Sequence, residues 1–271
     1  MPSIVPVYSI GKSYTAIALL RSLDPERQVG DVVPGLPEPL RPLTLLDLLS
    51  HRSGLDDYYP WPDYRAAVEA RETPWPAGSI LARAEVGAPG SFRYSNIGYL
   101  LLRLALEEHH QGSFFEVLDE LVLQPLEIHA HPFAELADWA RCDHPGIDDR
   151  LRAYHPGWVY TGTFAADPLE AARGLALVMQ GALGADLAAR LQQTWKVQVP
   201  PDHPMGPDAG YGLGMMTSGD PTSVLGHGGQ GPGLNLFAAT SADGSRWHGE
   251  VQASEGEDLE LVRRCVTRAR A

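Results

Sequence analysis

The pattern of hydrophobic and polar positions predicts a mainly helical region over the first three quarters of the chain. From Ser9 to Leu20 nearly every residue is apolar, and Lys12 is the only charged one. A helix that is apolar on almost every side is a buried helix. Thr44 and Gly54 have the residue types of an N-cap and a C-cap for a short helix between them. Helical spacing of apolar residues predicts these helices: 9–20, 43–51, 64–72, 97–109, 114–122, 169–181 and 185–195.

The last quarter of the chain has the alternation and turn residues of antiparallel strands. Strands are predicted at 211–216, 223–229, 233–241 and 246–254, followed by a helix at 258–270, and residues 1–8 form a strand-like lead-in. We therefore predict an α/β (α+β) fold in which the first helix packs on an antiparallel sheet. Residues 1–22 and 206–271 form the sheet lobe, residues 23–205 form the helical lobe, and the site lies between the lobes of one structural unit.

Composition excludes several classes of partner. The chain has 271 residues, 44% of them hydrophobic, and a formal net charge of -13. An acidic protein disfavours nucleic acid and anionic membranes as partners. No apolar run approaches a membrane span, and the N-terminus lacks the regions of a signal peptide, so we expect a cytoplasmic protein. Two cysteines, Cys142 and Cys265, are expected to be reduced thiols.

A lysine in an apolar helix needs a chemical reason. Ser9 and Lys12 are three residues apart and project from one face of the predicted helix. Desolvation favours the neutral form of a lysine, and a neutral amine beside a hydroxyl is a general base beside a nucleophile. A helix-capping serine followed by a surface lysine would have the same short pattern.

Other kinds of site lack their motifs. Gly11-Lys12-Ser13 is not a phosphate-binding loop, because Pro6 stands where that motif needs glycine. No Gly-x-Ser-x-Gly occurs. The pairs His109-His110 and His129-x-His131 lack the spacing of zinc ligands. We therefore predict no metal and no cofactor.

Three short motifs follow one another along the chain in a fixed order. Ser9-x-x-Lys12 comes first, Tyr94-Ser95-Asn96 precedes a helix, and His227-Gly228-Gly229 lies on a strand. Together they resemble the signature of the serine β-lactamase and penicillin-binding-protein superfamily. The resemblance extends to further segments and covers roughly residues 5–240, with the class C β-lactamase-like and esterase branch as the most similar. Those segments are 48–55, 89–99, 124–126, 211–214 and 226–233.

The resemblance implies a role for each matching residue. Ser9 is the nucleophile and acyl carrier, Lys12 takes or relays its proton, and Tyr94 is a second general base or acid whose pKa a nearby lysine lowers. Asn96 holds Lys12 and the acyl side chain. The oxyanion is bound by the backbone N–H groups of Ser9 and Gln230, while Gly228 and Gly229 let the strand backbone approach the substrate.

Two departures from the family pattern affect the functional prediction. Penicillin-directed members usually have lysine at the position of His227, and a histidine is mostly neutral near pH 7. This favours a carboxylesterase-type hydrolase of small esters or amides over a β-lactamase or D-amino-acid peptidase. A catalytically weak binding protein on the same fold is the third alternative.

The second departure is that only eight residues precede Ser9, where family members have several tens. We expect a narrower sheet with an uncovered edge, which favours homo-oligomerisation. A truncated start, a minimal member and completion by a partner chain are the competing explanations. The aromatic-rich residues 56–92 form either a wall of the substrate cleft or local packing.

Overall fold

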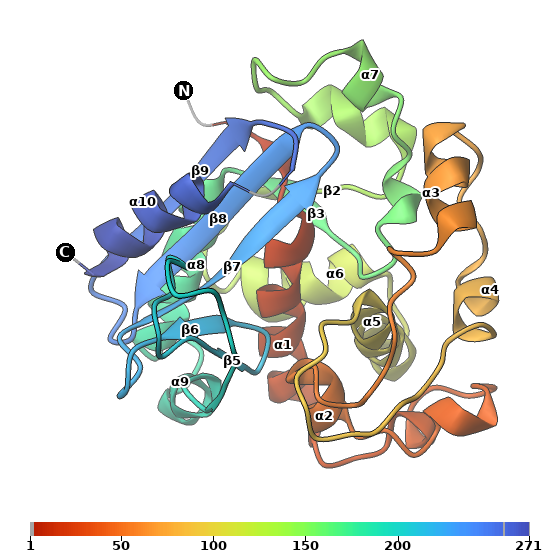
Figure 1. Ribbon diagram of the computed structural model, residues 1–271, viewed down its shortest axis with the longest axis horizontal. Helices are drawn as coiled ribbons and strands as arrows, with labels where there is room; N and C mark the ends of the chain where they lie inside the picture. Colours follow the sequence, from red (N-terminus) through yellow and green to blue (C-terminus); the bar gives the residue numbers. More distant parts are fainter. Residues whose placement is uncertain (1–2, 257, 271) are drawn as a thin grey trace.

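An antiparallel six-stranded sheet forms the framework of the molecule, and its strand order is β4-β5-β6-β7-β8-β9 (Figure 1). The computed structural model describes residues 3–256 and 258–270. The predicted lead-in therefore falls partly outside the described residues, at positions 1 and 2. The sheet strands are β4 (Thr194–Lys196), β5 (Gly210–Gly212), β6 (Met216–Ser218), β7 (Val224–Gly231), β8 (Leu234–Ser241) and β9 (Trp247–Ala253).

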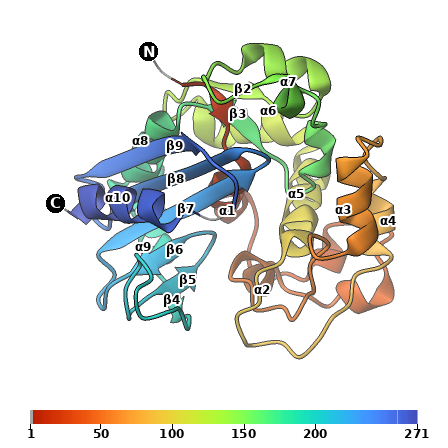
Figure 2. The same cartoon turned by 45° about the horizontal axis from the view of Figure 1, so that its top comes forward.

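Helices cover both faces of the long strands. Helix α10 (Leu259–Arg270) lies across one face of β7, β8 and β9, and α8 (Pro168–Met179) lies on the other face of β8 and β9 (Figure 2). Gly249 of β9 permits the close approach of α8, because a Cβ at this position would overlap the carbonyl oxygen of Pro168. Alternate β9 residues therefore face α8 and α10.

The first helix links the sheet to the helical part of the chain. It begins as a 3₁₀ turn, η1 (Tyr8–Ile10), and continues as α1 (Gly11–Ser22). Helix α1 contacts β7 on one side and α5 (Asn96–His110) on the other. Its residues from Gly11 to Leu20 are all buried. The prediction of a buried first helix is confirmed.

The remaining elements form the helical part and a small second sheet. That sheet has the strand order β1-β3-β2 and pairs β1 antiparallel to β3. The elements are β1 (Val5–Pro6), η2 (Val29–Asp31), η3 (Glu38–Leu40), α2 (Leu45–Leu49), α3 (Pro62–Glu69), α4 (Ala77–Leu81), α6 (Phe114–Leu118), the π-helical turn η4 (Asp119–Leu123), β2 (Ala130–Pro132), η5 (Leu136–Arg141), α7 (Asp149–Arg152), η6 (Pro156–Trp158), β3 (Phe164–Ala166) and α9 (Ala185–Leu191).

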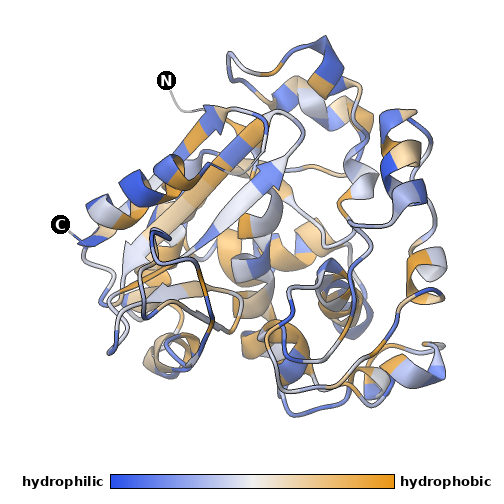
Figure 3. Cartoon of the chain, in the orientation of Figure 1, coloured by the Kyte–Doolittle hydropathy of each residue, from blue (hydrophilic) through white to orange (hydrophobic). Residues whose placement is uncertain are grey.

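The α/β fold class is confirmed, with hydrophobic strands and helices meeting at the centre (Figure 3). In β8 every residue is buried, whereas α10 buries one face and exposes a charged one. Two elements of the predicted helical lobe belong with the sheet, since β4 pairs with β5 and α8 packs on β8. The division into two lobes stays a prediction.

Three local predictions were wrong. Gly54 does not end α2, because the left-handed residue that follows the helix is His51, with a φ of 55°. The strand predicted at 211–216 is two strands, β5 and β6, separated by a turn with Gly214 at a φ of 78°. The helix predicted at 185–195 ends at Leu191, and Trp195 lies in β4.

Two other expectations can be compared directly with the structure. Thr44 caps α2 by accepting a hydrogen bond from the Asp47 backbone N–H, as predicted. Both cysteines are free and buried, and their reduced state stays a prediction. No helix among the described residues is long and apolar enough to cross a membrane.

Candidate active site

Ser9 and Lys12 lie together at the start of the first helix. Lys12 Nζ is 2.8 Å from Ser9 Oγ, and Lys12 is 1% exposed while Ser9 is half-buried. Ser9 follows Tyr8, which adopts a left-handed φ of 46° that is unusual for a residue other than glycine. This backbone conformation lies where the chain passes from β1 into η1, and Ser9 is partly exposed there.

The second motif reaches the same two side chains from the start of α5. The Tyr94 hydroxyl donates to Ser9 Oγ at 3.2 Å, and Asn96 Oδ1 accepts from Lys12 Nζ at 2.8 Å. Ser95 between them is the N-cap of α5, since its hydroxyl oxygen accepts from the Gly98 N–H at 3.1 Å. The cap fixes the backbone, so the side chains on either side of Ser95 both face η1.

Asp57 is a member of this group that the sequence analysis missed. Its carboxylate accepts two hydrogen bonds from Asn96, one from the backbone N–H at 3.1 Å and one from Nδ2 at 3.0 Å. Burial raises the pKa of Asp57, and the Asn96 hydrogen bonds and the charge of Lys12 oppose that shift. The only sequence signal was the acidic pair Asp56-Asp57 beside the aromatic segment.

His51 anchors residues 93–95 by two hydrogen bonds and by ring packing. Its Nδ1 accepts from the Ser95 N–H at 3.1 Å, its carbonyl oxygen accepts from the Arg93 N–H at 2.8 Å, and its ring lies 4.3 Å from that of Tyr94. Because Nδ1 accepts, the ring proton is on Nε2, which is buried and without a hydrogen-bond partner. Burial and the charges of Lys12 and His227 hold the pKa of His51 well below its ordinary value.

Burial sets the protonation of the two groups beside Ser9. It lowers the pKa of Lys12 to about 7, and the Asp57 carboxylate partly opposes this shift. Burial raises the pKa of Tyr94, although its hydrogen bond to Ser9 has the opposite effect. The expectation that a nearby lysine lowers the tyrosine pKa was therefore wrong, because desolvation dominates. At neutral pH Tyr94 is a proton donor, and Lys12 is the group that can be neutral.

His227 is buried in β7 and carries no positive charge at neutral pH. Its Nδ1 lies 2.6 Å from the Gly228 carbonyl oxygen and therefore holds the ring proton, so Nε2 accepts from the Tyr211 hydroxyl at 3.0 Å. Burial and the nearby Lys12 lower its pKa to about 3. Both ring nitrogens are used within the protein, which leaves His227 unable to bind a substrate carboxylate as a cation.

One edge of β7 faces η1, the turn that contains Ser9. The strand pairs with β8 from Val224 to Gly231 but with β6 only over residues 224–226. A Cβ on Gly229 would overlap the Val7 carbonyl oxygen, and one on Gly231 would overlap the Tyr8 ring. Gly228 has no such constraint, since its Cβ would meet Phe237 at 3.6 Å. Glycine is therefore needed for β7 to approach η1, and Gln230 lies between the two constrained positions.

The aromatic residues of segment 56–92 divide between the two predicted roles. Tyr58, Tyr64 and Trp75 pack with one another and with Trp158, so they form local structure. Phe92 differs, because its ring lies 6.0 Å from His51 and 5.4 Å from Tyr211 beside the site.

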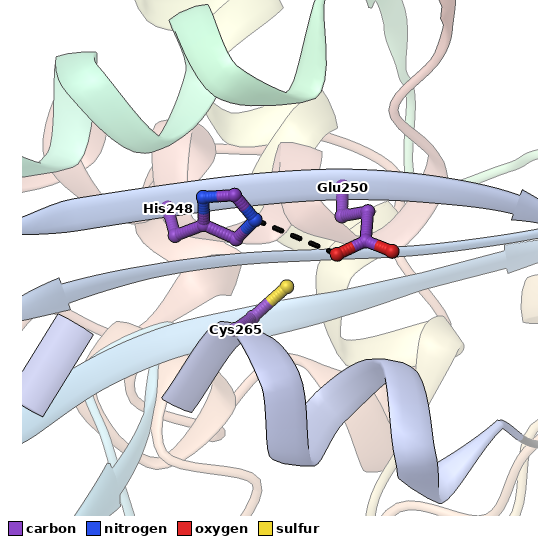
Figure 4. A group of neighbouring side chains, drawn as sticks. All are labelled: His248, Glu250 and Cys265. Carbon is purple, nitrogen blue, oxygen red and sulfur yellow. Dashed lines mark ion pairs between the residues drawn. The ribbon is translucent and has the colours of Figure 1, made fainter. Parts of the chain in front are cut away.

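A second cluster of polar side chains lies on the α10 face of β9. His248, Glu250 and Cys265 bring ligand-type atoms within 4.8 Å of one another (Figure 4). Glu250 also accepts from Arg264 at 2.7 Å, and burial raises the pKa of the Cys265 thiol to about 12. The Arg264 guanidinium already occupies the Glu250 carboxylate and the Cys265 thiol stays protonated, so both disfavour binding of a metal cation here. The cluster instead joins α10 to the sheet.

The fold is that of the serine β-lactamase and transpeptidase superfamily. A sequence profile of the Beta-lactamase family matches residues 3–243, and the chain belongs to this family. Membership supports a serine hydrolase in general. No curated protein matches the chain.

Solved structures with the same fold have low sequence identity to this chain. A D-stereospecific amidohydrolase from Streptomyces sp. is 22% identical, with a TM-score of 0.79 over 96% of this chain and 86% of its own. D-amino acid amidase from Ochrobactrum anthropi SV3 is 18% identical, with a TM-score of 0.75 over 97% and 85%. An octameric penicillin-binding protein homologue from Pyrococcus abyssi is 19% identical, with a TM-score of 0.73 over 96% and 64%.

Proposed function

We propose that the protein is a serine hydrolase that acts through an acyl-enzyme on Ser9, most simply as a carboxylesterase-type hydrolase of small esters or amides. One observation carries this proposal. The Ser9 hydroxyl has an amine 2.8 Å away and a phenol 3.2 Å away, supplied by two segments far apart in the chain. A nucleophile between a general base and a general acid is the arrangement that acyl transfer needs.

The proton transfers follow from the protonation of the two neighbours. Neutral Lys12 takes the Ser9 proton as Oγ attacks the substrate carbonyl carbon, and the oxyanion is bound by the N–H groups of Ser9 and Gln230. Tyr94 is protonated in the resting site, so it donates to the leaving group when the tetrahedral intermediate collapses. Water then attacks the acyl-enzyme and gives a proton to the Tyr94 phenolate, while protonated Lys12 returns its proton to Ser9 Oγ as the acyl group leaves.

The neutral His227 supports uncharged substrates. Its ring is buried and has a pKa lowered to about 3, so it offers no cation for a carboxylate. An ester or amide without a carboxylate near the scissile bond fits this site better than a β-lactam or an acidic D-peptide. The substrate site in this proposal includes Asn96, His227, Gly228, Gly229 and Gln230.

Hydrolysis of a short-chain p-nitrophenyl ester tests the proposal. Ser9→Ala should abolish turnover above the uncatalysed rate, and Lys12→Met should reduce it by at least about 100-fold. Lys196→Met is a matched control, because Lys196 is exposed and pairs with Asp208 on the surface. Equal rates for the wild type and Ser9→Ala would reject the proposal.

A D-amino-acid amidase is the second candidate, since two of the similar folds belong to proteins described as a D-stereospecific amidohydrolase and a D-amino acid amidase. D- and L-phenylalanine amides distinguish it from an esterase. Intact mass spectrometry with activated esters and β-lactams tests the remaining alternatives. A Ser9 acyl adduct with a β-lactam would support a β-lactamase, and no adduct with any reagent would support a binding protein.

We also propose that the chain assembles with itself. Within the described residues β9 pairs with β8 alone, which leaves its other edge available for a further strand. The similar fold from Pyrococcus abyssi is described as octameric. Light scattering tests this proposal, and a strictly monomeric protein would contradict it.

A further inference from the structure

A continuous chain of hydrogen bonds runs from Asp57 to Ser9. Asp57 accepts from Asn96 Nδ2 at 3.0 Å, Asn96 Oδ1 accepts from Lys12 Nζ at 2.8 Å, and Lys12 lies 2.8 Å from Ser9 Oγ. We propose that Asp57 is a positioning residue of the Ser9 site, which fixes the orientation of the Asn96 amide and supplies the negative charge that opposes desolvation of Lys12. The proposal rests on the proposed function of Ser9.

Asp57 fixes which end of the Asn96 side-chain amide faces Lys12. A side-chain amide has a donor end and an acceptor end that can exchange by a flip. The Asp57 carboxylate has acceptors only, so it holds the donor end of Asn96 and directs Oδ1 toward Lys12. Asparagine at position 57 can satisfy a flipped Asn96, and that flip would present an NH₂ group to Lys12.

Asp57 also supplies the negative charge that acts on the Lys12 pKa. It is the acidic group among the side chains around Lys12, and its carboxylate raises the lysine pKa against the larger effect of burial. The other groups around Lys12 carry no charge at pH 7. They come from several elements around Lys12: Ser9 on η1, His51 after α2, Tyr94 before α5, Asn96 and Tyr99 on α5, and His227 on β7.

The location of Asp57 also explains how the fold accommodates a carboxylate beside the site. Its second hydrogen bond comes from the backbone N–H of Asn96, the first residue of α5. The first N–H groups of a helix have no partner within the helix, and the N-terminus favours a negative charge. The same contact therefore stabilises the carboxylate and anchors it to the residue that it orients.

The composition of the chain allows a direct measurement of the Lys12 charge. Lys12 and Lys196 are its only lysines. In a protein labelled with ¹³C-lysine, the two side-chain Cε signals can be followed through a pH titration by NMR, and Lys196 serves as the internal reference. We expect a wild-type midpoint for Lys12 of about 7. Asp57→Asn should lower that midpoint by about one pH unit or more, because an opposite charge is removed.

Asp56→Asn is the matched control. It removes the same charge from the neighbouring residue, whose side chain accepts from the Glu85 N–H instead of Asn96. We expect the Lys12 midpoint of this variant to equal that of the wild type. An unchanged midpoint in Asp57→Asn would overturn the proposal, and so would an equal shift in Asp56→Asn.

Kinetics test the orientation of the amide. With p-nitrophenyl acetate as the probe, Asp57→Asn should lower the optimum kcat/KM roughly 10- to 100-fold and move its acid limb to lower pH. In an Asn96→Ala background the same substitution should have a much smaller effect on the optimum. An undiminished effect in that background would overturn the role in orientation.

Two further comparisons keep the outcomes distinct. If Asp57→Asn does not fold, Asp57→Glu retains the charge, and its Lys12 midpoint should stay near the wild-type value while kcat/KM falls. A midpoint shifted by a unit in Asp57→Glu would overturn the proposal. The NMR titration needs no turnover, so it decides the effect of Asp57 on Lys12 even where an inactive wild type rejects the proposed function.

Discussion

The ring of Tyr8 packs directly against the backbone of Gly231, so the residue before Ser9 touches the last residue of β7. Tyr8 is 2% exposed and its hydroxyl has no hydrogen-bond partner among the described residues, so the contact with Gly231 is van der Waals packing. It fixes the distance between η1, which contains Ser9, and the strand that contains Gln230.

Gly231→Ala should therefore disturb the site from the strand side. The new methyl group would overlap the Tyr8 ring, and we expect kcat/KM for a p-nitrophenyl ester to fall roughly 100-fold, since misplacement by an ångström has this effect. Gly78→Ala is the control, because no atom lies within 4 Å of its Cβ position. Adding Tyr8→Ala should restore part of the loss, and a Gly231→Ala enzyme as active as the wild type would contradict the prediction.

The rate of acylation should depend on the ionisation of Lys12. Because its pKa is lowered to about 7 and the neutral amine is the base in the proposed mechanism, kcat/KM should rise with pH through about 7 and then level off. Tyr94 has a raised pKa, so loss of its proton adds no alkaline limb over this range. A pH–rate profile from pH 5 to 9 measures this, with Lys12→Met expected to lose the limb together with the activity.

Lys12 should also make the stability of the fold depend on pH. Between about 7, its pKa in the folded protein, and 10.5, its ordinary value, the unfolded chain binds more protons than the folded one. The free energy of unfolding therefore rises with pH in this window. Urea denaturation at pH 7 and pH 9 should show the wild type gaining stability relative to Lys12→Met. A difference that is constant with pH would argue against a desolvated lysine.

Substrates with and without a carboxylate test the role of His227. Its buried, neutral ring predicts that a p-nitrophenyl hemisuccinate is hydrolysed more slowly than the butyrate ester of similar length. The comparison uses kcat/KM at pH 7 and low ionic strength, where an attracting cation would have its largest effect. A preference for the hemisuccinate would show that another group binds the carboxylate.

The sequence predicted most of the helices because their signal is local. The apolar run before Leu20 and the periodic residues of α5 need no distant partner to be recognised. The failures at His51 and Gly214 arose where backbone geometry depends on tertiary contacts. Gly214 turns beside Lys12, and a Cβ there would overlap the Cβ of Ala16. The sequence of β5 and β6 gives no indication that Ala16 of α1 lies beside this turn.

The site was predictable only where its residues belong to recognisable motifs. Ser9, Lys12, Tyr94 and Asn96 lie together as the motifs implied. Asp57 belongs to no motif and reaches the site through a partner 39 positions away. The direction of the Tyr94 pKa shift was wrong because the motifs indicate only that Lys12 is near Tyr94. The burial of Tyr94, which dominates the shift, is visible only in the structure.

Two hydrogen bonds of the candidate site, Lys12 to Asn96 and Tyr94 to Ser9, join residues that are 84 and 85 positions apart. Contacts of such long range form only when the overall topology is in place, and they contribute to slow folding. Partly folded forms that retain their helices would still lack the assembled site. Recovery of the proposed acylation of Ser9 during refolding should therefore report completion of the native topology, at a stage when circular dichroism already shows most of the helical signal.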